Sequence, residues 1–346
     1  MRRYSAVLVT VFLICILITG CGSKQSSSPA DEVRLIFAAY TTPREAYSEI
    51  IPRFKSYWEE RTGEKVIFEE SYLGSGAQSR AIVEGFEADI VALSLEADVT
   101  RIQKAGLITH DWKKGEFNGI VTTSIVAFAV REGNPKNIKD WDDLAKPGIE
   151  ILMPNPNMSG GAMWNILGLF GAALRGHCNG VPFEDETAAA IFLGQVLTNV
   201  SVMDKSARES ILSFEMGIGD IAVTYENEVL VGQNSGQKYE LVIPTSTIMI
   251  QNPIAILDVN VDKHGTRDVA EAFVDFLYSR EAQDIFARHG LRVVNPEVAA
   301  AADALYPDVK DLFTVDYFGG WERVMEDYFG SDGVYNTVLQ QIHQAE

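Results

Sequence analysis

The pattern that most constrains the fold is an alternation of short apolar strands and helices, which runs through the chain twice. In the first half, a β-branched run at 33–38 precedes a helical pattern at 44–61, and further strands are expected at 65–69 and 90–93. Alternating strands and helices imply a mostly parallel sheet with helices on both faces. The sequence therefore predicts an α/β fold.

The second alternation is flanked by two long strand-like runs, at 122–130 and 247–257. Two α/β units joined by two long strands indicate two lobes between which the chain crosses twice, with the C-terminal helices packing back on the first lobe. We assign 31–122 and 256–346 to lobe 1 and 123–255 to lobe 2. Ligands of open α/β sheets bind beyond the carboxyl ends of strands, so a cleft between the lobes is the expected site.

The N-terminus has the features of an export signal. Within residues 1–20, two arginines near the start are followed by an apolar run that is too short to span a bilayer comfortably. The run ends in Ile-Thr-Gly-Cys21, which resembles the bacterial lipobox, where the cysteine thiol takes a diacylglyceryl group before cleavage. Residues 21–30 form a flexible tether rich in serine. We expect a signal peptide, a lipid anchor on Cys21 and an extracytoplasmic location, periplasmic or at the cell surface; the alternative is an uncleaved anchor with an incidental cysteine.

Composition and charge exclude several classes of protein. With 47% hydrophobic and 22% charged residues, the chain is too apolar to be disordered and too mixed to span a membrane repeatedly. Its 29 basic and 48 acidic side chains give a net charge of −19, which opposes the phosphate backbone, so no nucleic acid partner is expected. Cys178 is the one cysteine outside the signal and lipobox, so no structural disulfide is expected.

Catalytic and metal motifs are not supported. The sequence contains no Walker A, HExxH, EF-hand or CxxC pattern, and its five histidines are scattered. A GxGxxA match at 217–222 precedes a predicted strand instead of following it, which indicates a turn. Ser75 is flanked directly by glycines and does not match the nucleophile elbow of hydrolases. We therefore expect no enzymatic activity, no cofactor and no metal ion.

Four loop-to-helix junctions rich in Gly, Ser and Thr remain as candidate binding elements, at 40–43, 74–76, 157–161 and 205–208. Each follows a predicted strand and opens a predicted helix, where free backbone N–H groups and the positive end of the helix dipole favour an anion. Ordinary helix capping explains any one of them. Four in one chain, drawn from both predicted lobes, favour an anion site.

A set of short motifs, in a fixed order, extends from about Leu35 to Val334. It comprises Ala39–Glu45, Gly74-Ser75-Gly76, Glu87–Leu93, Pro154-Asn155-Pro156, Ser159–Ala162, Trp164-Asn165, Gly217–Asp220, Glu226-Asn227-Glu228 and Phe318–Trp321. In this order the chain resembles the sulfate/thiosulfate-binding proteins of bacterial ABC importers. The resemblance implies the periplasmic-binding-protein fold, whose two α/β lobes close on the ligand, and a monomer that delivers its anion to permease subunits in the membrane without catalysis.

The resemblance also implies that uncharged groups bind the dehydrated dianion. The family's pattern is matched at five of these positions, Ser75, Ser159, Gly160, Gly161 and Ala207. Two positions depart from it. Thr41 stands where the family has aspartate in a turn that supplies a backbone N–H, which is a mild change, and Tyr225 stands where the family has an indole.

Tyr225 bears on the identity of the anion, because a phenol can accept a hydrogen bond as well as donate one, whereas an indole only donates. Sulfate has no proton at pH 7, so a pocket of donors satisfies it, while hydrogen phosphate brings an O–H that needs an acceptor. We expect sulfate first and thiosulfate close behind, with phosphate or molybdate as the alternative. Arg44, Arg208 and Glu226 are expected around the site, where the arginines supply charge or form salt bridges to Glu45 or Glu226.

Two other classes of function stay open at this stage. A secreted hydrolase or sulfotransferase-like protein could use the same anion pocket, although no nucleophile and base are paired near any junction. A sensory or adhesive lipoprotein could keep the fold and lose ligand binding.

Overall fold

The computed structural model describes residues 32–345, and the predicted signal peptide, the tether and Cys21 lie outside this range. None of the helices in the described range combines the length and the apolar character needed to cross a bilayer. A single curled sheet organises the molecule, with strands in the order β2-β1-β3-β9-β4-β7-β5-β6 and with β8, β10 and β11 pairing beside this path.

The first lobe is built on the parallel strands β1 (Glu32–Tyr40), β2 (Lys65–Leu73) and β3 (Ile90–Ala92). Its helices are α1 (Arg44–Thr62), α2 (Ser75–Val83), α3 (Glu96–Lys104), α9 (Asp258–His264), α10 (Arg267–Leu277) and α11 (Arg280–Arg288). Aromatic and aliphatic side chains from β1, α1, α10 and α11 form one buried cluster between sheet and helices. Helix α1 ends at Gly63, whose φ of 77° is the left-handed conformation that glycine adopts readily.

The second lobe repeats this plan with β5 (Ile151–Pro154), β6 (Val200–Asp204), β7 (Ile221–Tyr225) and β8 (Glu240–Val242). Its helices are α4 (Trp141–Leu144), α5 (Gly160–Leu174), α6 (Glu186–Thr198), α7 (Ala207–Glu215) and α8 (Glu226–Asn234). Strand β5 is parallel to both β6 and β7, so their carboxyl ends point the same way. Helices α5 and α7 therefore begin at one edge of the sheet.

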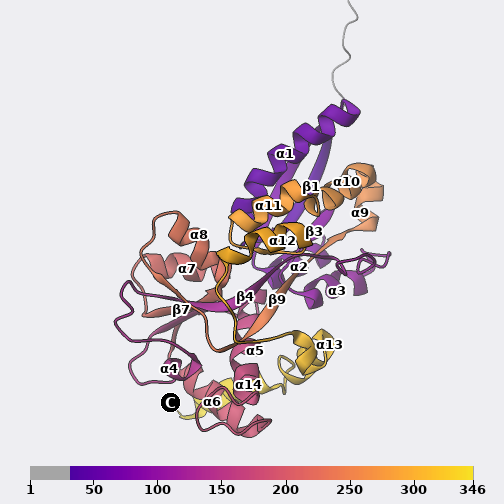
Figure 1. Cartoon of the computed structure of the whole chain (residues 1–346). Coiled ribbons are helices and arrows are strands. Elements are labelled where there is room, and N and C mark those ends of the chain that lie inside the picture. The colour runs from indigo at the N-terminus through magenta and orange to yellow at the C-terminus, as the bar shows by residue number, and fades with distance from the viewer. Residues whose placement is uncertain (1–31, 346) are drawn as a thin grey trace, which may run out of the picture.

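Two long antiparallel strands, β4 (Ile120–Val130) and β9 (Ser246–Ile256), join the lobes. The first half of β4 pairs with β9 and its second half pairs with β7 of the second lobe. The last residues of β9 pair with β3 of the first lobe. Each strand thus belongs to both lobes, and in Figure 1 β4 and β9 lie at the waist of the molecule.

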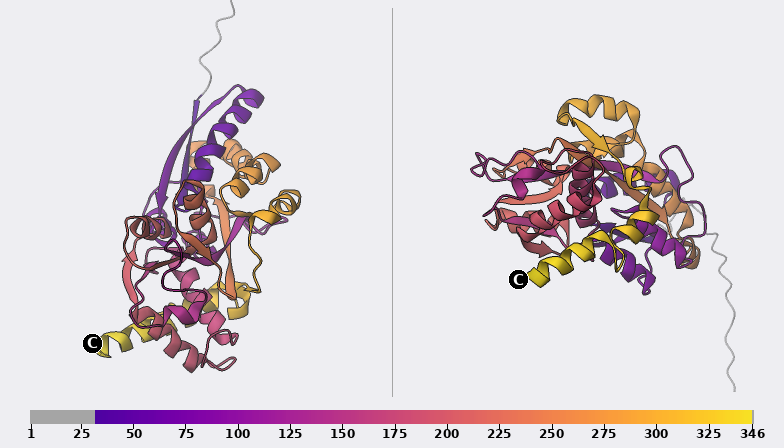
Figure 2. Two further views of the ribbon diagram at one scale, coloured as in Figure 1. Left: turned by 60° about the vertical axis from the view of Figure 1, so that its left-hand side comes forward. Right: turned by 90° about the horizontal axis from the view of Figure 1, so that it is seen from below.

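The C-terminal part of the chain divides between the lobes. After β10 (Arg292–Val293) it forms α12 (Pro296–Ala302), a turn of 3-10 helix (Asp303–Leu305), β11 (Asp311–Phe313), a second 3-10 helix (Val315–Phe318), α13 (Trp321–Asp327) and α14 (Val334–Ala345). Figures 1 and 2 show α14 beside α6 at the end of the molecule far from α1.

The C-terminal segment contacts both lobes. Helix α12 lies on α11 and α13 contacts α3, both in the first lobe. Strand β11 pairs with the start of β9, and Phe313 and Phe318 enter the same buried cluster as side chains of α5 and α6. The lobe boundaries given from the sequence stay a prediction.

Candidate anion-binding site

Three of the predicted junctions meet where the lobes touch, at the starts of α2, α5 and α7. A Cβ atom added at Gly74, just before α2, would lie 2.5 Å from the carbonyl oxygen of Met158 and 2.7 Å from that of Lys205. Met158 precedes α5 and Lys205 precedes α7. The Ala77 amide also donates a hydrogen bond of 3.2 Å to the Met158 carbonyl. The structure therefore brings one helix N-terminus of the first lobe against two of the second.

The first turn of α5 is the most crowded part of this meeting point. A Cβ added at Gly161 would lie 2.7 Å from Cε2 of Tyr225 and 3.3 Å from Cβ of Ala207. Three of the predicted site residues, Gly161, Ala207 and Tyr225, are therefore neighbours. Amides in the first turn of a helix have no acceptor within that helix, so those of Gly160 and Gly161 are available to a ligand.

The two predicted serines have different surroundings. Ser159 is buried at the N-cap position of α5, and its hydroxyl makes no capping hydrogen bond. The Ser75 hydroxyl donates to Oδ2 of the buried Asp98 at 2.6 Å and accepts the N–H of Ser94 at 3.1 Å. Its hydrogen is thus held by a carboxylate that the sequence analysis did not include in the site. Ser75 contacts an anion through its hydroxyl only when that hydrogen turns away from Asp98.

Tyr225 ends strand β7 and is buried at the boundary between the lobes. Its hydroxyl lies 2.6 Å from Oγ of Ser94, a first-lobe residue that sequence reasoning missed. Burial raises the pKa of the Tyr225 phenol, which therefore stays neutral at physiological pH. The ring centroid of Tyr40 lies 6.1 Å from that of Tyr225, and the buried Tyr40 hydroxyl has no hydrogen-bond partner among residues 32–345.

Thr41 and Arg44 stand at the start of α1. Thr41 is half-buried in the turn before the helix, and its carbonyl accepts the Arg44 amide at 3.3 Å. The Arg44 guanidinium lies over the ring of Tyr72, with 5.3 Å from Cζ to the ring centroid. Arg44 thus makes a cation–π contact within the first lobe, and neither of the salt bridges considered for it is formed among the described residues.

Arg208 connects the lobes beside the start of α7. Its guanidinium forms a salt bridge of 2.6 Å with Glu45, as considered from the sequence, and donates to the Thr42 carbonyl at 3.3 Å. Its Nε also lies 3.1 Å from Oε2 of Glu228, without the alignment of a hydrogen bond. Burial raises the pKa of the Glu228 carboxyl to about 7, and Arg208 opposes this shift.

Glu226 does not pair with Arg44 or Arg208. It accepts two hydrogen bonds from Arg292, at 2.7 Å to Nε and 3.0 Å to Nη2, and its side chain is fully buried. This bidentate pair ties α8 to the strand that follows α11. The arginine partner of Glu226 could not be identified from the sequence, because Arg292 stands 66 residues away in a segment with no motif.

Known proteins are similar to this one over most of the chain. The model of the bacterial extracellular solute-binding protein family matches residues 35–292. The sulfate-binding protein of Synechococcus elongatus is 44% identical over 342 residues, covering 98% of this chain and 96% of that protein. The chain belongs to the sulfate- and thiosulfate-binding family of solute-binding proteins.

Two further members of this family support the assignment. The thiosulfate-binding protein of Pseudomonas aeruginosa is 34% identical, covering 88% of this chain and 91% of that protein. The structure of the sulfate-binding protein SubI from Mycobacterium tuberculosis superimposes with a TM-score of 0.77 at 36% identity, covering 84% of this chain and 98% of that one. The predicted family and the predicted periplasmic-binding-protein fold are therefore confirmed.

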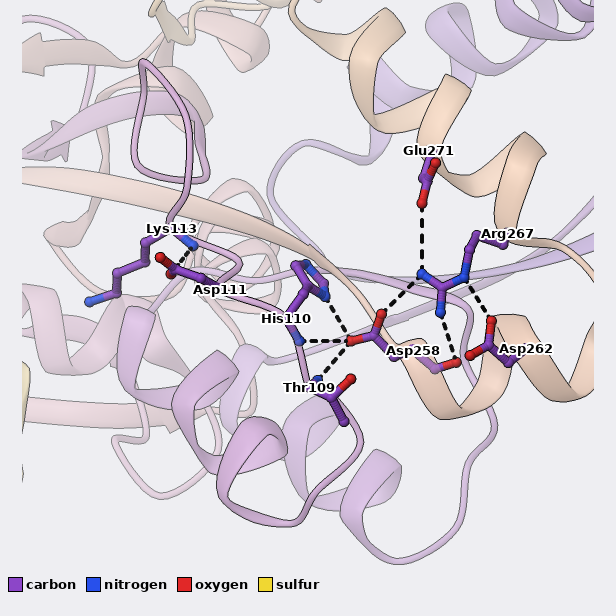
Figure 3. Close-up of polar contacts among 8 residues, drawn as sticks. All are labelled: Thr109, His110, Asp111, Lys113, Asp258, Asp262, Arg267 and Glu271. Carbon is purple, nitrogen blue, oxygen red and sulfur yellow. Dashed lines mark hydrogen bonds and ion pairs between the residues drawn. The ribbon is translucent and has the colours of Figure 1, made fainter.

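Figure 3 shows a second polar network, which is centred on Asp258. Asp258, at the start of α9, accepts the amides of Thr109 and His110 at 2.7 and 3.1 Å, the His110 ring at 2.7 Å and Arg267 at 3.0 Å. These hydrogen bonds hold the pKa of Asp258 well below its usual range, although burial opposes them. The network fixes α9 to the loop before β4. Within residues 32–345, no group of His, Cys, Asp and Glu side chains is placed to hold a metal ion.

Proposed function

We propose that this protein is the solute-binding subunit of an ABC importer that binds sulfate or thiosulfate and passes it to a permease. One observation carries the proposal: helix N-termini from both lobes meet at α2, α5 and α7. Free backbone N–H groups and the positive ends of helix dipoles lie at helix N-termini, so their proximity supports a site for a small dianion. The relatives named as sulfate- and thiosulfate-binding proteins support the choice of anion.

The proposed ligand groups are uncharged. They are the amides of Gly160, Gly161, Ala207 and Thr41 and the hydroxyls of Ser75, Ser159 and Tyr225. Neutral donors satisfy each oxygen of a fully ionised anion without placing a competing charge beside it. Catalysis is not part of the proposal, because the relatives over most of the chain are named as sulfate- and thiosulfate-binding proteins.

The proposal also includes a membrane anchor and an oligomeric state. Cys21 carries a diacylglyceryl anchor in this proposal and holds the protein on the outer side of a membrane, next to the permease. We also propose that the binding protein acts as a monomer, because all the proposed ligand groups come from one chain.

Calorimetry of the soluble domain, residues 31–346, tests the proposed ligand. We expect binding of sulfate and thiosulfate that is about fivefold to 150-fold tighter than binding of hydrogen phosphate, since a donor facing the phosphate O–H costs about 1–3 kcal/mol. Molybdate and tungstate complete the panel. Tighter binding of phosphate or molybdate than of sulfate would identify another oxyanion as the ligand. Turnover of sulfate or phosphate esters would contradict the non-catalytic assignment.

Gly161 offers a direct test of the site. Gly161→Val should weaken sulfate binding by about fivefold to 150-fold, because its Cβ would lie 2.7 Å from Cε2 of Tyr225 and overpacking costs about 1–3 kcal/mol. The control is Gly194→Val, because Gly194 lies in α6, far from the junctions. Gly217→Val would not serve, because the φ of 94° at Gly217 strains any other residue. Sulfate affinity that is equal in Gly161→Val and the parent would remove α5 from the binding site.

A further inference from the structure

Ser94 connects the two lobes near the proposed anion site. It follows β3 and is fully buried. Its N–H donates to Oγ of Ser75 at 3.1 Å within the first lobe. Across the boundary its carbonyl accepts Nε1 of Trp164 on α5 at 3.0 Å, and its hydroxyl lies 2.6 Å from that of Tyr225. All three polar groups of Ser94 are therefore engaged.

The two hydroxyls lie against the first turn of α5. A Cβ added at Gly160 would be 2.7 Å from Oγ of Ser94, and one added at Gly161 would be 3.3 Å from the hydroxyl oxygen of Tyr225. The paired hydroxyls thus lie beside the two glycine residues whose amides open the helix. A group in this position can contact the same ligand as those amides.

The pair has one hydrogen to offer. Two hydroxyls carry two hydrogens, and one of these lies between the two oxygens. Within residues 32–345, neither hydroxyl has a second hydrogen-bond partner. The other hydrogen is free, whichever oxygen bears it, because the bond between the hydroxyls can run in either direction.

We propose that Ser94 is a specificity-determining residue, which forms with Tyr225 a two-hydroxyl unit that donates one hydrogen bond to the bound oxyanion. Ser94 orients the Tyr225 hydroxyl and joins the lobes in the same contact. The inference rests on the proposed function, since it requires an anion at the start of α5. It goes beyond that function by adding a first-lobe side chain to the groups that distinguish one anion from another.

A purely structural link between the lobes is the competing explanation, and thiosulfate separates the two. Loss of a structural link weakens every ligand that closes the lobes by the same factor. Loss of a hydrogen bond to the anion affects sulfate more than thiosulfate, because thiosulfate can turn its terminal sulfur, a weak acceptor, toward the vacated position.

The experiment is calorimetry of the soluble domain with sulfate and thiosulfate for four variants: Ser94→Ala, Tyr225→Phe, the double variant and the control Ser246→Ala. Ser246 matches Ser94 in burial, and its hydroxyl donates at 2.6 Å to Asp311, far from the junctions. We expect Ser94→Ala to lose about tenfold in sulfate affinity and at least about threefold less in thiosulfate affinity. The control should stay within about twofold of the parent for both anions.

The double variant gives a second, independent measurement. If the hydroxyls act as one unit, the double variant binds sulfate no more weakly than the weaker of the two single variants. The hydroxyl that remains in each single variant has lost the partner that orients its hydrogen toward the anion, so removing it as well costs nothing further. Equal losses for sulfate and thiosulfate, or losses that multiply in the double variant, would overturn the inference. A parent protein that binds neither anion would instead refute the proposed function. Thermal unfolding of each variant confirms that it is folded.

Discussion

Gly74→Ala should weaken anion binding without disturbing either lobe on its own. Gly74 precedes α2 with φ −59° and ψ 140°, a conformation open to any residue, so alanine brings no backbone strain. The added Cβ meets backbone atoms only across the boundary, at 2.5 Å from the Met158 carbonyl and 2.7 Å from the Lys205 carbonyl. Cβ atoms essentially never approach other atoms within 3.0 Å, so the lobes must separate by at least about half an ångström.

The size of the effect follows from the rigidity of the two carbonyls. They are main-chain groups at the starts of helices and cannot turn aside as a flexible side chain would. Overpacking of this kind costs about 1–3 kcal/mol, and this cost destabilises only the conformation in which the lobes are in contact. Since about 1.4 kcal/mol is tenfold in affinity, sulfate binding should weaken by roughly 5-fold to 150-fold. The separation would also break the hydrogen bond from the Ala77 amide to the Met158 carbonyl.

Three measurements on the soluble domain test this reasoning. Calorimetry gives the affinity for sulfate, small-angle scattering with and without sulfate reports the compaction of the lobes, and thermal unfolding without sulfate reports the stability of the fold. Gly194→Ala is the matched control, because its Cβ would lie in α6 at an ordinary 3.4 Å from Val338. A Gly74→Ala protein that binds sulfate within twofold of the parent would show that this contact is not part of the bound state.

Three other outcomes are expected. Glu228→Gln should raise the free energy of unfolding by up to roughly 3 kcal/mol relative to the parent at pH 8, but not at pH 4.5. Burial raises the pKa of the Glu228 carboxyl from 4.5 to about 7, so its ionisation destabilises the folded parent as the pH rises through that range. Urea unfolding at both pH values tests this, and a difference between variant and parent that does not change with pH would refute it. Arg292→Ala should lower the free energy of unfolding by about 3–5 kcal/mol, because it leaves the Glu226 carboxylate buried and unpaired. The double variant Arg292→Met with Glu226→Gln should regain most of that stability in the same urea assay. Cys21→Ala should abolish membrane partition of the full-length protein; unchanged mobility and partition would refute the anchor.

The parts of the fold that local patterns determine could be predicted from the sequence. The helix expected at 44–61 is α1, and the starts expected near 76, 161 and 207 lie at Ser75, Gly160 and Ala207. Glycine and serine mark these starts because they cap helices or admit close approach of the backbone. The shared edge at which α5 and α7 begin followed from the parallel strands before them, whose carboxyl ends point the same way.

Partners distant in the sequence could not be predicted. Ser94 lies in a short apolar run, and nothing in that run indicates a contact with Tyr225, which stands 131 residues away. The pairing of β11 with β9 is equally nonlocal, so the aromatic residues at 313 and 318 gave no indication of which lobe they would join. Asp98 carried no motif, although its carboxylate holds the Ser75 hydroxyl.

The negative charge of the chain is compatible with an anion site because the buried acids near the helix starts are each matched by an arginine. Asp98 lies 2.5 Å from Arg101, Glu228 lies 3.1 Å from Arg208, and Glu226 lies 2.7 Å from Arg292. A buried pair contributes little net field at the ligand, whereas surface carboxylates beyond about 8 Å are screened by salt at physiological ionic strength. What remains at the meeting point of α2, α5 and α7 is the positive end of three helix dipoles. The pairing of the acids therefore makes a net charge of −19 compatible with the proposed site, in which neutral donors bind a dianion.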